Sequence, residues 1–234
     1  MNGIKGVKIL RFEELDSTQD YAKNLRENGE DTVVIARRQR GGKGTKNRSF
    51  SSESGGLYLS KLSFYENFPA KHAFLIMERA AVAVCKTLES YGFAPKIKWA
   101  NDIFVNGKKI CGILIENVFS GDKIANSVVG IGLNVNNDLP DELSKIATSM
   151  REAAGKVFDL REVENRLLEY LNEEIDSGEY QKHLGWLGEE VILVSGDERV
   201  PATLLSVTER GELIAKIHGE ERIIAAGEVS LRVE

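Results

Sequence analysis

The sequence predicts an α+β fold, with a main domain of strands and helices followed by a small β domain. The first 187 residues combine strand-length apolar segments with one long stripe of apolar residues at helical spacing. Beyond Gly188 only short strand-like segments remain, bounded by Gly, Asp or Glu turns. We therefore expect a main domain at residues 1–187 and a small antiparallel barrel at residues 188–234.

The first half of the main domain is expected to alternate strands with helices. Ser17 and Thr18 are residue types that cap helix N-termini, although they could also bind a polar ligand there. The expected elements are a strand at 7–12, a helix ended by Gly29, strands at 32–36 and 57–64, and a buried helix at 72–91.

The second half is expected to contain hairpins and then helices. Asn106-Gly107 lies between two apolar runs and is a strong hairpin signal. The other expected elements are a second hairpin through Gly121-Asp122, a short helix with Pro140 at its first position, a helix from Asp159 to about Ile175, and strands at 191–194, 202–207, 213–217 and 223–226.

The composition is that of an ordinary globular protein. The chain has 234 residues, of which 42% are hydrophobic and 29% charged, and a formal net charge of -5. This charge argues against a broad nucleic-acid-binding surface. Two cysteines and three scattered histidines predict neither a disulfide framework nor a His/Cys metal site. No apolar run reaches the ~18–20 residues that span a bilayer, and no signal-peptide core begins the chain, so we expect a cytoplasmic protein.

A basic, glycine-rich segment at residues 37–50 is the strongest local signal. It holds six basic residues, three glycines and no acidic residue, and it lies between two predicted strands. Glycines let backbone N–H groups approach an anion, and Lys and Arg add charge for phosphate or carboxylate. A solvated surface loop is the alternative. Because Gly44 rather than Ser or Thr follows Lys43, the segment is not a Walker P-loop.

Polar residues also interrupt the predicted hairpins. Four of them fall in the first hairpin, where buried polar groups need partners or a ligand: Lys98, Asn101, Asp102 and Lys109. Gly130 and Gly132 lie inside a predicted strand, which indicates a bulge or a close approach by another group. Asn134 follows them and is either a reader of a nucleotide base or part of an Asx turn.

Five segments together resemble the biotin protein ligases in order and approximate spacing, and the similarity covers nearly the whole chain. The resemblance implies a mixed sheet packed with helices, related to the class II aminoacyl-tRNA synthetases, and an SH3-like C-terminal barrel. It also implies the ligase-only form, which lacks an N-terminal DNA-binding domain. The segments are Ser17-Thr18-Gln19, residues 39–50, residues 98–102, residues 109–116 and residues 130–134.

The resemblance implies two half-reactions. Biotin reacts with ATP, with the help of Mg²⁺, to give biotinoyl-5′-AMP and pyrophosphate. The acyl group then passes to a lysine of the biotin carboxyl carrier protein of acetyl-CoA carboxylase. Neither DNA nor a membrane is expected as a partner, and a homodimer is left open.

The resemblance also implies roles for individual residues. The catalytic positions are Lys109, Arg48 and Lys43. The biotin-binding positions are Ser17, Thr18, Gln39, Lys109 and Gly112. The positions expected to bind ATP or the adenylate are Gly42, Lys43, Gly44, Arg48, Phe50, Ser51, Asn101 and Asn134. Asp102 is the candidate magnesium ligand.

The sequence departs from the family pattern at four positions. Thr45 and Asn47 stand where the loop often has Arg and Gly, Ala100 replaces a usual proline, and Phe50 replaces a usual tryptophan. Loss of the arginine puts retention of the acyl-adenylate in doubt. The rival interpretations are a lipoate or octanoate ligase or transferase of the same broad fold and a nucleic-acid-binding module. The uncharged polar set at Ser17, Thr18 and Gln39 favours biotin over an aliphatic tail.

Overall fold

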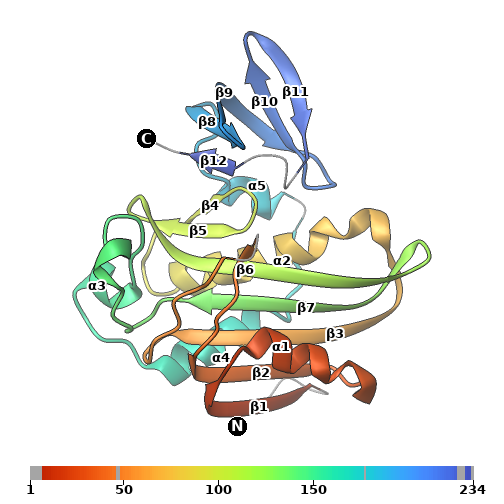
Figure 1. The fold of residues 1–234 in the computed structure, drawn as a ribbon, viewed down its shortest axis with the longest axis vertical. Coiled ribbons are helices and arrows are strands. Elements are labelled where there is room, and N and C mark those ends of the chain that lie inside the picture. The colour runs from red at the N-terminus through yellow and green to blue at the C-terminus, as the bar shows by residue number, and fades with distance from the viewer. Residues whose placement is uncertain (1–6, 46–47, 177, 226–229, 233–234) are drawn as a thin grey trace.

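A computed structural model describes residues 7–45, 48–176, 178–225 and 230–232. It contains a large sheet with helices on both faces and a smaller sheet at the C-terminal end (Figure 1). This arrangement confirms the predicted α+β class.

The large sheet is mixed, as the resemblance implied. Its seven strands are in the order β1-β2-β3-β7-β6-β5-β4, with β1 parallel to β2 and every other neighbouring pair antiparallel. The strands are β1 (Lys8–Leu15), β2 (Thr32–Gln39), β3 (Leu57–Pro69), β4 (Lys96–Lys98), β5 (Asp102–Val105), β6 (Lys108–Ser120) and β7 (Lys123–Leu133).

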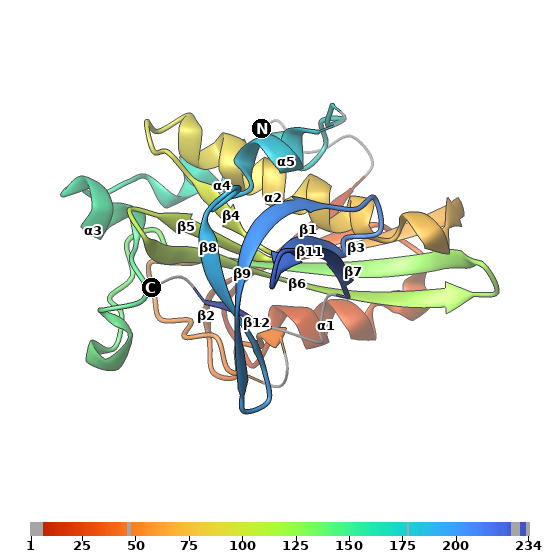
Figure 2. The ribbon, with the colours of Figure 1, turned by 90° about the horizontal axis from the view of Figure 1, so that it is seen from above.

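Helices cover both faces of this sheet, with α1 on one side and α2 on the other (Figure 2). Beneath α1 lies a small buried cluster of Ala22, Val34, Leu62 and Val128. The larger core lies on the α2 face. The helices are α1 (Thr18–Asn24), α2 (Phe74–Glu89), α3 (Met150–Ala154), α4 (Leu160–Tyr170) and α5 (Glu179–His183), and 3₁₀ turns are η1 (Arg26–Asn28), η3 (Ala70–His72) and η4 (Asp141–Leu143).

The smaller sheet is antiparallel and has five strands in the order β11-β10-β9-β8-β12. It contacts the main domain through a buried hydrogen bond of 3.0 Å from Trp99 Nε1 to the carbonyl oxygen of Gly211. This sheet confirms the predicted small β domain at the C-terminal end. The domain boundary at residue 187 stays a prediction. The strands are β8 (Glu190–Ser195), β9 (Glu198–Val207), β10 (Leu213–Ile217), β11 (Glu220–Ile224) and β12 (Ser230–Arg232).

Three local predictions were wrong in detail. Helix α4 ends at Tyr170 rather than near Ile175, because Asn172 caps its last turn by donating from Nδ2 to the backbone oxygen of Leu168. Pro140 occupies the N-cap of η4 rather than its first helical position. The first arm of the hairpin predicted around Asn106-Gly107 is not one strand but two, β4 and β5, which pair with each other across residues 99–101. The strand expected at 223–226 extends to residue 226, which lies outside the described residues.

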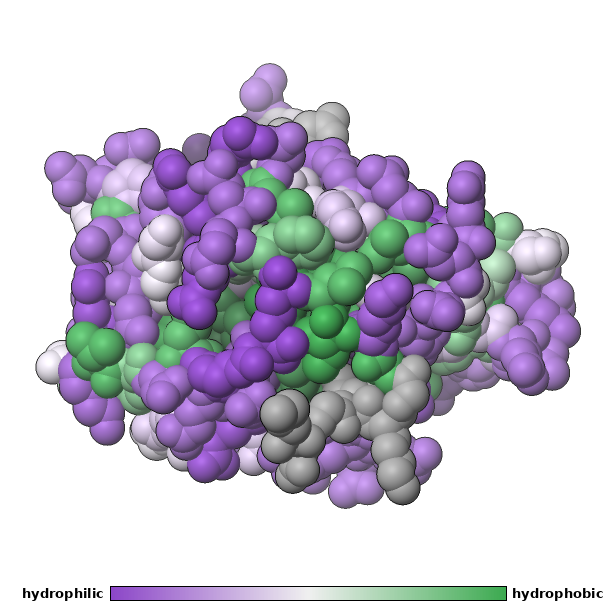
Figure 3. All heavy atoms as spheres, turned by 90° about the horizontal axis from the view of Figure 1, so that it is seen from below, coloured by the Kyte–Doolittle hydropathy of each residue, from purple (hydrophilic) through white to green (hydrophobic). Residues whose placement is uncertain are grey.

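Three further observations concern the helices and the surface. No helix within the described ranges is long and apolar enough to cross a membrane. On the side of the sheet where β1 lies, apolar surface gathers at the centre and hydrophilic residues surround it (Figure 3). A groove on the surface is lined by parts of β1 and β2 and by the start of α4.

The core on the α2 face gives a stability prediction. Leu88 is 0% exposed in α2. Leu88→Ala should lower the free energy of unfolding by about 2–5 kcal/mol, because it removes buried methyl groups and leaves a cavity. Urea denaturation followed by circular dichroism measures this loss. Val157→Ala is the control, since Val157 is 74% exposed and its truncation should change stability by less than about 0.5 kcal/mol.

Candidate active site

A pocket opens on the α1 face of the large sheet. Its floor is formed by three glycines on neighbouring strands, because Gly112 on β6 pairs with Gly132 on β7, and Gly130 lies two residues before Gly132 on the same face. The remaining lining residues are Ser17, Thr18, Gln19, Gln39, Lys43, Gly44, Thr45, Phe50, Leu59, Ser60, Asn101, Lys109, Ile113, Leu114 and Ile131.

These glycines permit close contact between the strands and three side chains above them. A Cβ atom at Gly130 would lie 2.5 Å from Gln19 Oε1, and one at Gly132 would lie 2.6 Å from the ring of Phe50. At Gly112 it would lie 3.2 Å from both Phe50 and the Lys109 ammonium group. The sequence indication of a close approach at Gly130 and Gly132 is therefore confirmed.

The N-terminus of α1 forms one wall. Ser17 caps the helix, because its hydroxyl accepts a hydrogen bond from the backbone N–H of Asp20. Gln39 lies at the end of β2, where its Oε1 accepts from the backbone N–H of Thr18 at 2.8 Å and from the Thr18 hydroxyl at 3.0 Å. The Thr18 hydroxyl is also 2.9 Å from that of Ser60. Ser17 therefore caps the helix and also lines the pocket, so both roles predicted for this segment are possible.

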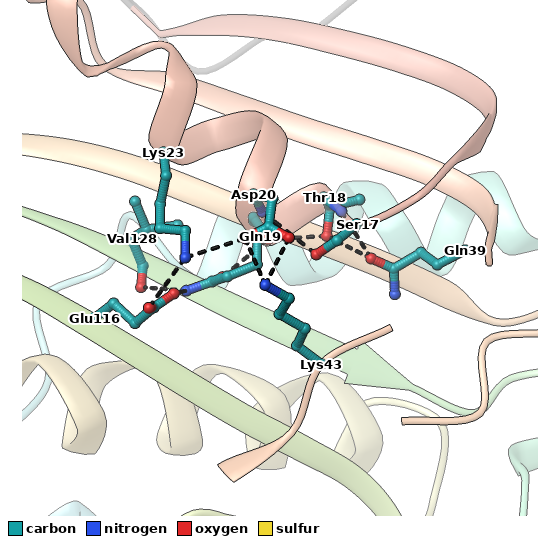
Figure 4. A network of polar contacts seen from close by, with 10 residues as sticks. Ser17, Thr18, Gln19, Asp20, Lys23, Gln39, Lys43, Glu116 and Val128 are labelled. Carbon is teal, nitrogen blue, oxygen red and sulfur yellow. Dashed lines mark hydrogen bonds and ion pairs between the residues drawn. The ribbon is translucent and has the colours of Figure 1, made fainter. Parts of the chain in front are cut away.

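A second glutamine continues this chain of contacts (Figure 4). The Ser60 hydroxyl donates to Gln19 Oε1 at 3.2 Å. Gln19 Nε2 donates to Glu116 Oε2 at 2.8 Å and to the backbone oxygen of Val128 at 3.3 Å. Lys23 Nζ then contacts Glu116 Oε1 at 3.2 Å. A continuous polar network therefore runs from Gln39 on β2 to Glu116 on β6.

Lys43 carries the positive charge of the basic segment into the pocket. Its Nζ lies 2.7 Å from a carboxylate oxygen of Asp20, which also contacts Lys23 at 3.0 Å (Figure 4). Burial raises the pKa of Asp20, but its hydrogen bonds with Lys43 and Lys23 outweigh burial, so the pKa lies below its usual value. Asp20 is therefore ionised at neutral pH, and its single negative charge is shared between the two lysines.

Lys109 lies at the opposite side of the pocket. Its Nζ is 2.7 Å from Asp102 Oδ1 and 5.9 Å from the centroid of the Phe50 ring. Asn101, beside Asp102, is fixed by a hydrogen bond of 2.9 Å from its Nδ2 to the backbone oxygen of Ile113. The Lys109 side chain is 32% exposed, so an anion in the pocket can reach its ammonium group.

The structure brings most of the predicted site residues together, but not all of them. The predicted residues that line the pocket are Ser17, Thr18, Gln39, Lys43, Gly44, Phe50, Asn101, Lys109 and Gly112. Those outside the lining are Gly42, Arg48, Ser51, Asp102 and Asn134.

The contacts of three of the residues outside the lining are defined by the structure. Asp102 is the ion-pair partner of Lys109. Arg48 is exposed on the basic segment, where its backbone oxygen accepts from Gly44. Asn134 is buried, and its amide donates to the backbone oxygen of Thr148 and accepts from Asn137. These contacts are not the Asx turn that was one of the two alternatives, and they tie Asn134 to Thr148 and Asn137.

Sequence reasoning missed four side chains of the polar network: Gln19, Lys23, Ser60 and Glu116. Gln19 directly follows Thr18, and Glu116 ends a strand of mainly apolar residues, so each carried a weak signal. Their contact joins residues 97 positions apart and becomes visible only when α1 is placed over β6.

A metal site formed by the protein alone does not fit the residues that the structure describes. In that part of the chain, no group of three His, Cys, Asp or Glu side chains could hold a metal ion. Mg²⁺ is commonly held by one or two carboxylates together with substrate phosphates and water. Asp102 fits only the role of a single carboxylate for an ion carried by a nucleotide.

Known proteins resemble both the sequence and the fold. The profile of the Biotin/lipoate A/B protein ligase family matches residues 12–134. The bifunctional ligase/repressor BirA of Bacillus subtilis is 38% identical over 162 residues, which are 67% of this chain and 50% of that protein. The chain thus spans about half the length of this relative. A biotin–[acetyl-CoA-carboxylase] ligase of Mycobacterium tuberculosis is 25% identical over 84% of this chain and 77% of its own length.

Among solved structures, the biotin protein ligase of Aquifex aeolicus in complex with biotin and ATP matches 97% of this chain and 99% of its own, with a TM-score of 0.75 and 30% identity. The matched part of the chain therefore includes both the large sheet and the smaller C-terminal sheet. The chain belongs to the Biotin/lipoate A/B protein ligase family.

Proposed function

We propose that the protein is a biotin protein ligase, which activates biotin with ATP and transfers it to a lysine of a biotin carboxyl carrier protein. Family membership and the likeness to the Aquifex aeolicus ligase over nearly the whole of both chains support this proposal. The choice of biotin over lipoate depends on the polar wall of the pocket.

In that wall there are fewer hydroxyl protons than oxygen–oxygen contacts that need a proton to be hydrogen bonds. Gln39 Oε1 must face Thr18, because a backbone N–H donates to it, and Gln19 Nε2 must face its two oxygen acceptors. Both amide oxygens therefore point toward the hydroxyls of Thr18 and Ser60. These two hydroxyl protons face three close oxygen–oxygen contacts, so one contact lacks a proton.

This surplus of acceptors is the observation that carries the proposal. The ureido ring of biotin brings N–H donors that can satisfy the acceptors, whereas the dithiolane ring of lipoate brings none. A site that hydrogen-bonds a substrate group discriminates strongly against an analogue that lacks the group, because its own polar atoms are left unpaired. We therefore assign the ureido end of biotin to the wall formed by Ser17, Thr18 and Gln39.

The charged side of the pocket suits adenylation. In this step a biotin carboxylate oxygen attacks the α-phosphorus of ATP, the bond to the bridging oxygen of the β-phosphate breaks, and pyrophosphate leaves. Two anions must approach each other, and Lys109 can neutralise the charge between them once it leaves Asp102. Lys43 and Arg48 would hold the phosphates, and Gly42 and Gly44 let the backbone approach them.

Phe50 is the expected neighbour of adenine, with Ser51 and Asn101 as polar contacts. Its ring now lies against Gly112 and Gly132, so nucleotide stacking would require the ring to turn off the glycine floor. Mg²⁺ would reach the site on the ATP phosphates, where it adds positive charge, with Asp102 as the protein carboxylate. In the second step the carrier lysine attacks the acyl carbon, and AMP leaves.

The cellular setting also belongs to the proposal. Cys85 and Cys111 are free and buried thiols, which agrees with the reducing conditions of the predicted cytoplasmic location. The carrier protein is the proposed partner, and a homodimer remains compatible with this function. A nucleic-acid-binding role has no support from the pocket, whose lysines are paired with carboxylates.

The substrate assignment is tested by measuring pyrophosphate release with Mg-ATP and either biotin or lipoate. Biotin should support release, and a purified carrier domain should then become biotinylated. Release with lipoate should be lower by at least about 10⁴-fold, the discrimination expected when buried hydrogen-bonding groups lose their partner. Equal rates with lipoate, or no release with biotin, would overturn the assignment.

Lys109→Ala tests the proposed neutralisation of charge. Single-turnover formation of the adenylate should slow by about 10²–10³-fold, the effect of losing one preorganised electrostatic group. Lys108→Ala is the matched control, because Lys108 is the neighbouring lysine of β6 but contacts Glu152 and Ser144 instead. A Lys109→Ala rate close to that of the Lys108→Ala control would remove Lys109 from the mechanism.

A further inference from the structure

Glu116 lies at the edge of the pocket and is not among the residues lining it. It projects from β6 on the same face as Gly112, and its two carboxylate oxygens have different partners. Oε2 accepts from Gln19, and Oε1 accepts from Lys23 (Figure 4). Lys23 in turn contacts Asp20 at 3.0 Å. The carboxylate is thus held between a buried amide and an ammonium group that is itself held in place.

The amide of Gln19 depends on this carboxylate for its orientation. Gln19 is 4% exposed and rests on Gly130, so its amide plane has little freedom to move sideways. A rotation by half a turn would exchange its oxygen and nitrogen. The contact with Val128 opposes that exchange only through a hydrogen bond of 3.3 Å, whereas Glu116 accepts at 2.8 Å and bears a charge.

The orientation of this amide determines what the pocket offers a ligand. With Oε1 toward Ser60, the wall has an excess of acceptors, and an N–H donor fits it. With Nε2 toward Ser60, the same wall would gain two protons and the excess would vanish. An ionised Glu116 is therefore needed to keep the wall receptive to donors. Burial raises the pKa of Glu116, but Gln19 and Lys23 outweigh burial and hold the pKa below its usual value.

We propose that Glu116, anchored by Lys23, is a positioning residue that fixes the orientation of the Gln19 amide and so makes the pocket selective for ligands with N–H donors. This inference rests on the proposed function, because the ligand it concerns is the ureido ring of biotin. Glu116 does not touch the reacting atoms, so its effect falls on biotin binding rather than on the chemical step.

Glu116→Gln tests this role with almost no change in shape. The new amide can donate to Gln19 Oε1, which allows the Gln19 amide to rotate. We expect the Kd for biotin, measured by isothermal titration calorimetry, to rise about tenfold, the size of losing a buried hydrogen-bonded partner. The Kd for ATP and the single-turnover rate at saturating biotin should stay within about twofold of wild type, as expected when only uniform binding is lost.

Two further variants make the result specific. Glu27→Gln is the matched control, because it removes the same charge from an exposed residue just after α1 and should leave the Kd unchanged. Lys23→Gln should raise the Kd by a few-fold, because it leaves Glu116 in place without its anchor. Thermal unfolding followed by circular dichroism checks that each variant is folded.

A double-mutant cycle shows whether Glu116 acts through Gln19. Gln19→Met removes the amide, so adding Glu116→Gln to that variant should change the Kd for biotin by less than about twofold if the coupling is complete. Additive effects would overturn the inference, and so would a Glu116→Gln protein that binds biotin like wild type. Absence of biotin binding by the wild-type protein would instead refute the proposed function.

Discussion

The pocket depends on one constraint, the absence of side chains from three neighbouring positions on one face of β6 and β7. Gly112, Gly130 and Gly132 let Gln19 and Phe50 approach the backbone of the sheet directly. The pairing of Gly112 with Gly132 places these positions side by side. Because side chains alternate between the faces of a strand, a shift of one residue would move this bare surface to the core side.

The pocket also requires the polar network of Gln19, Ser60 and Glu116, and this network depends on the bare glycine surface. Gln19 reaches Glu116 and Ser60 because it can rest on Gly130. The orientation of each amide is fixed, because Gln39 accepts from a backbone N–H and Gln19 donates to two oxygen atoms. The hydroxyl protons between the two amides therefore have few possible directions. The wall is consequently defined by the direction of its hydrogen bonds as well as by its shape. Shape alone would discriminate weakly between rings of similar size.

Local features of the fold could be predicted from the sequence because their signals lie within short segments. Residues 72–91 have the helical stripe that became α2, and Asn106-Gly107 forms the turn between β5 and β6 with both residues at positive φ. The parallel pairing of β1 with β2 could not be predicted, since nothing in either strand encodes its neighbour. The turn between β4 and β5 was missed because the polar residues Lys98, Asn101 and Asp102 were interpreted as an interruption within one hairpin strand.

The candidate site divides in the same way. The resemblance located Thr18, Gln39 and Lys109, which line the pocket, because they belong to contiguous motifs. Glu116 was missed because its role depends on contacts with α1, almost a hundred residues earlier. Asn134 illustrates the opposite case, since a polar residue after a glycine-rich strand is consistent with a ligand contact, yet its amide is engaged by Thr148 and Asn137.

The two lysines that line the described pocket are each paired with a carboxylate, Lys43 with Asp20 and Lys109 with Asp102. An incoming anion therefore exchanges with an internal anion instead of meeting a bare positive charge. Chloride or inorganic phosphate would gain little from this exchange, because each would have to displace a well-placed carboxylate without filling the rest of the pocket. The internal carboxylates thus act as built-in competitors, and they keep the site available for a ligand that contacts the glycine floor and the polar wall as well as the lysines.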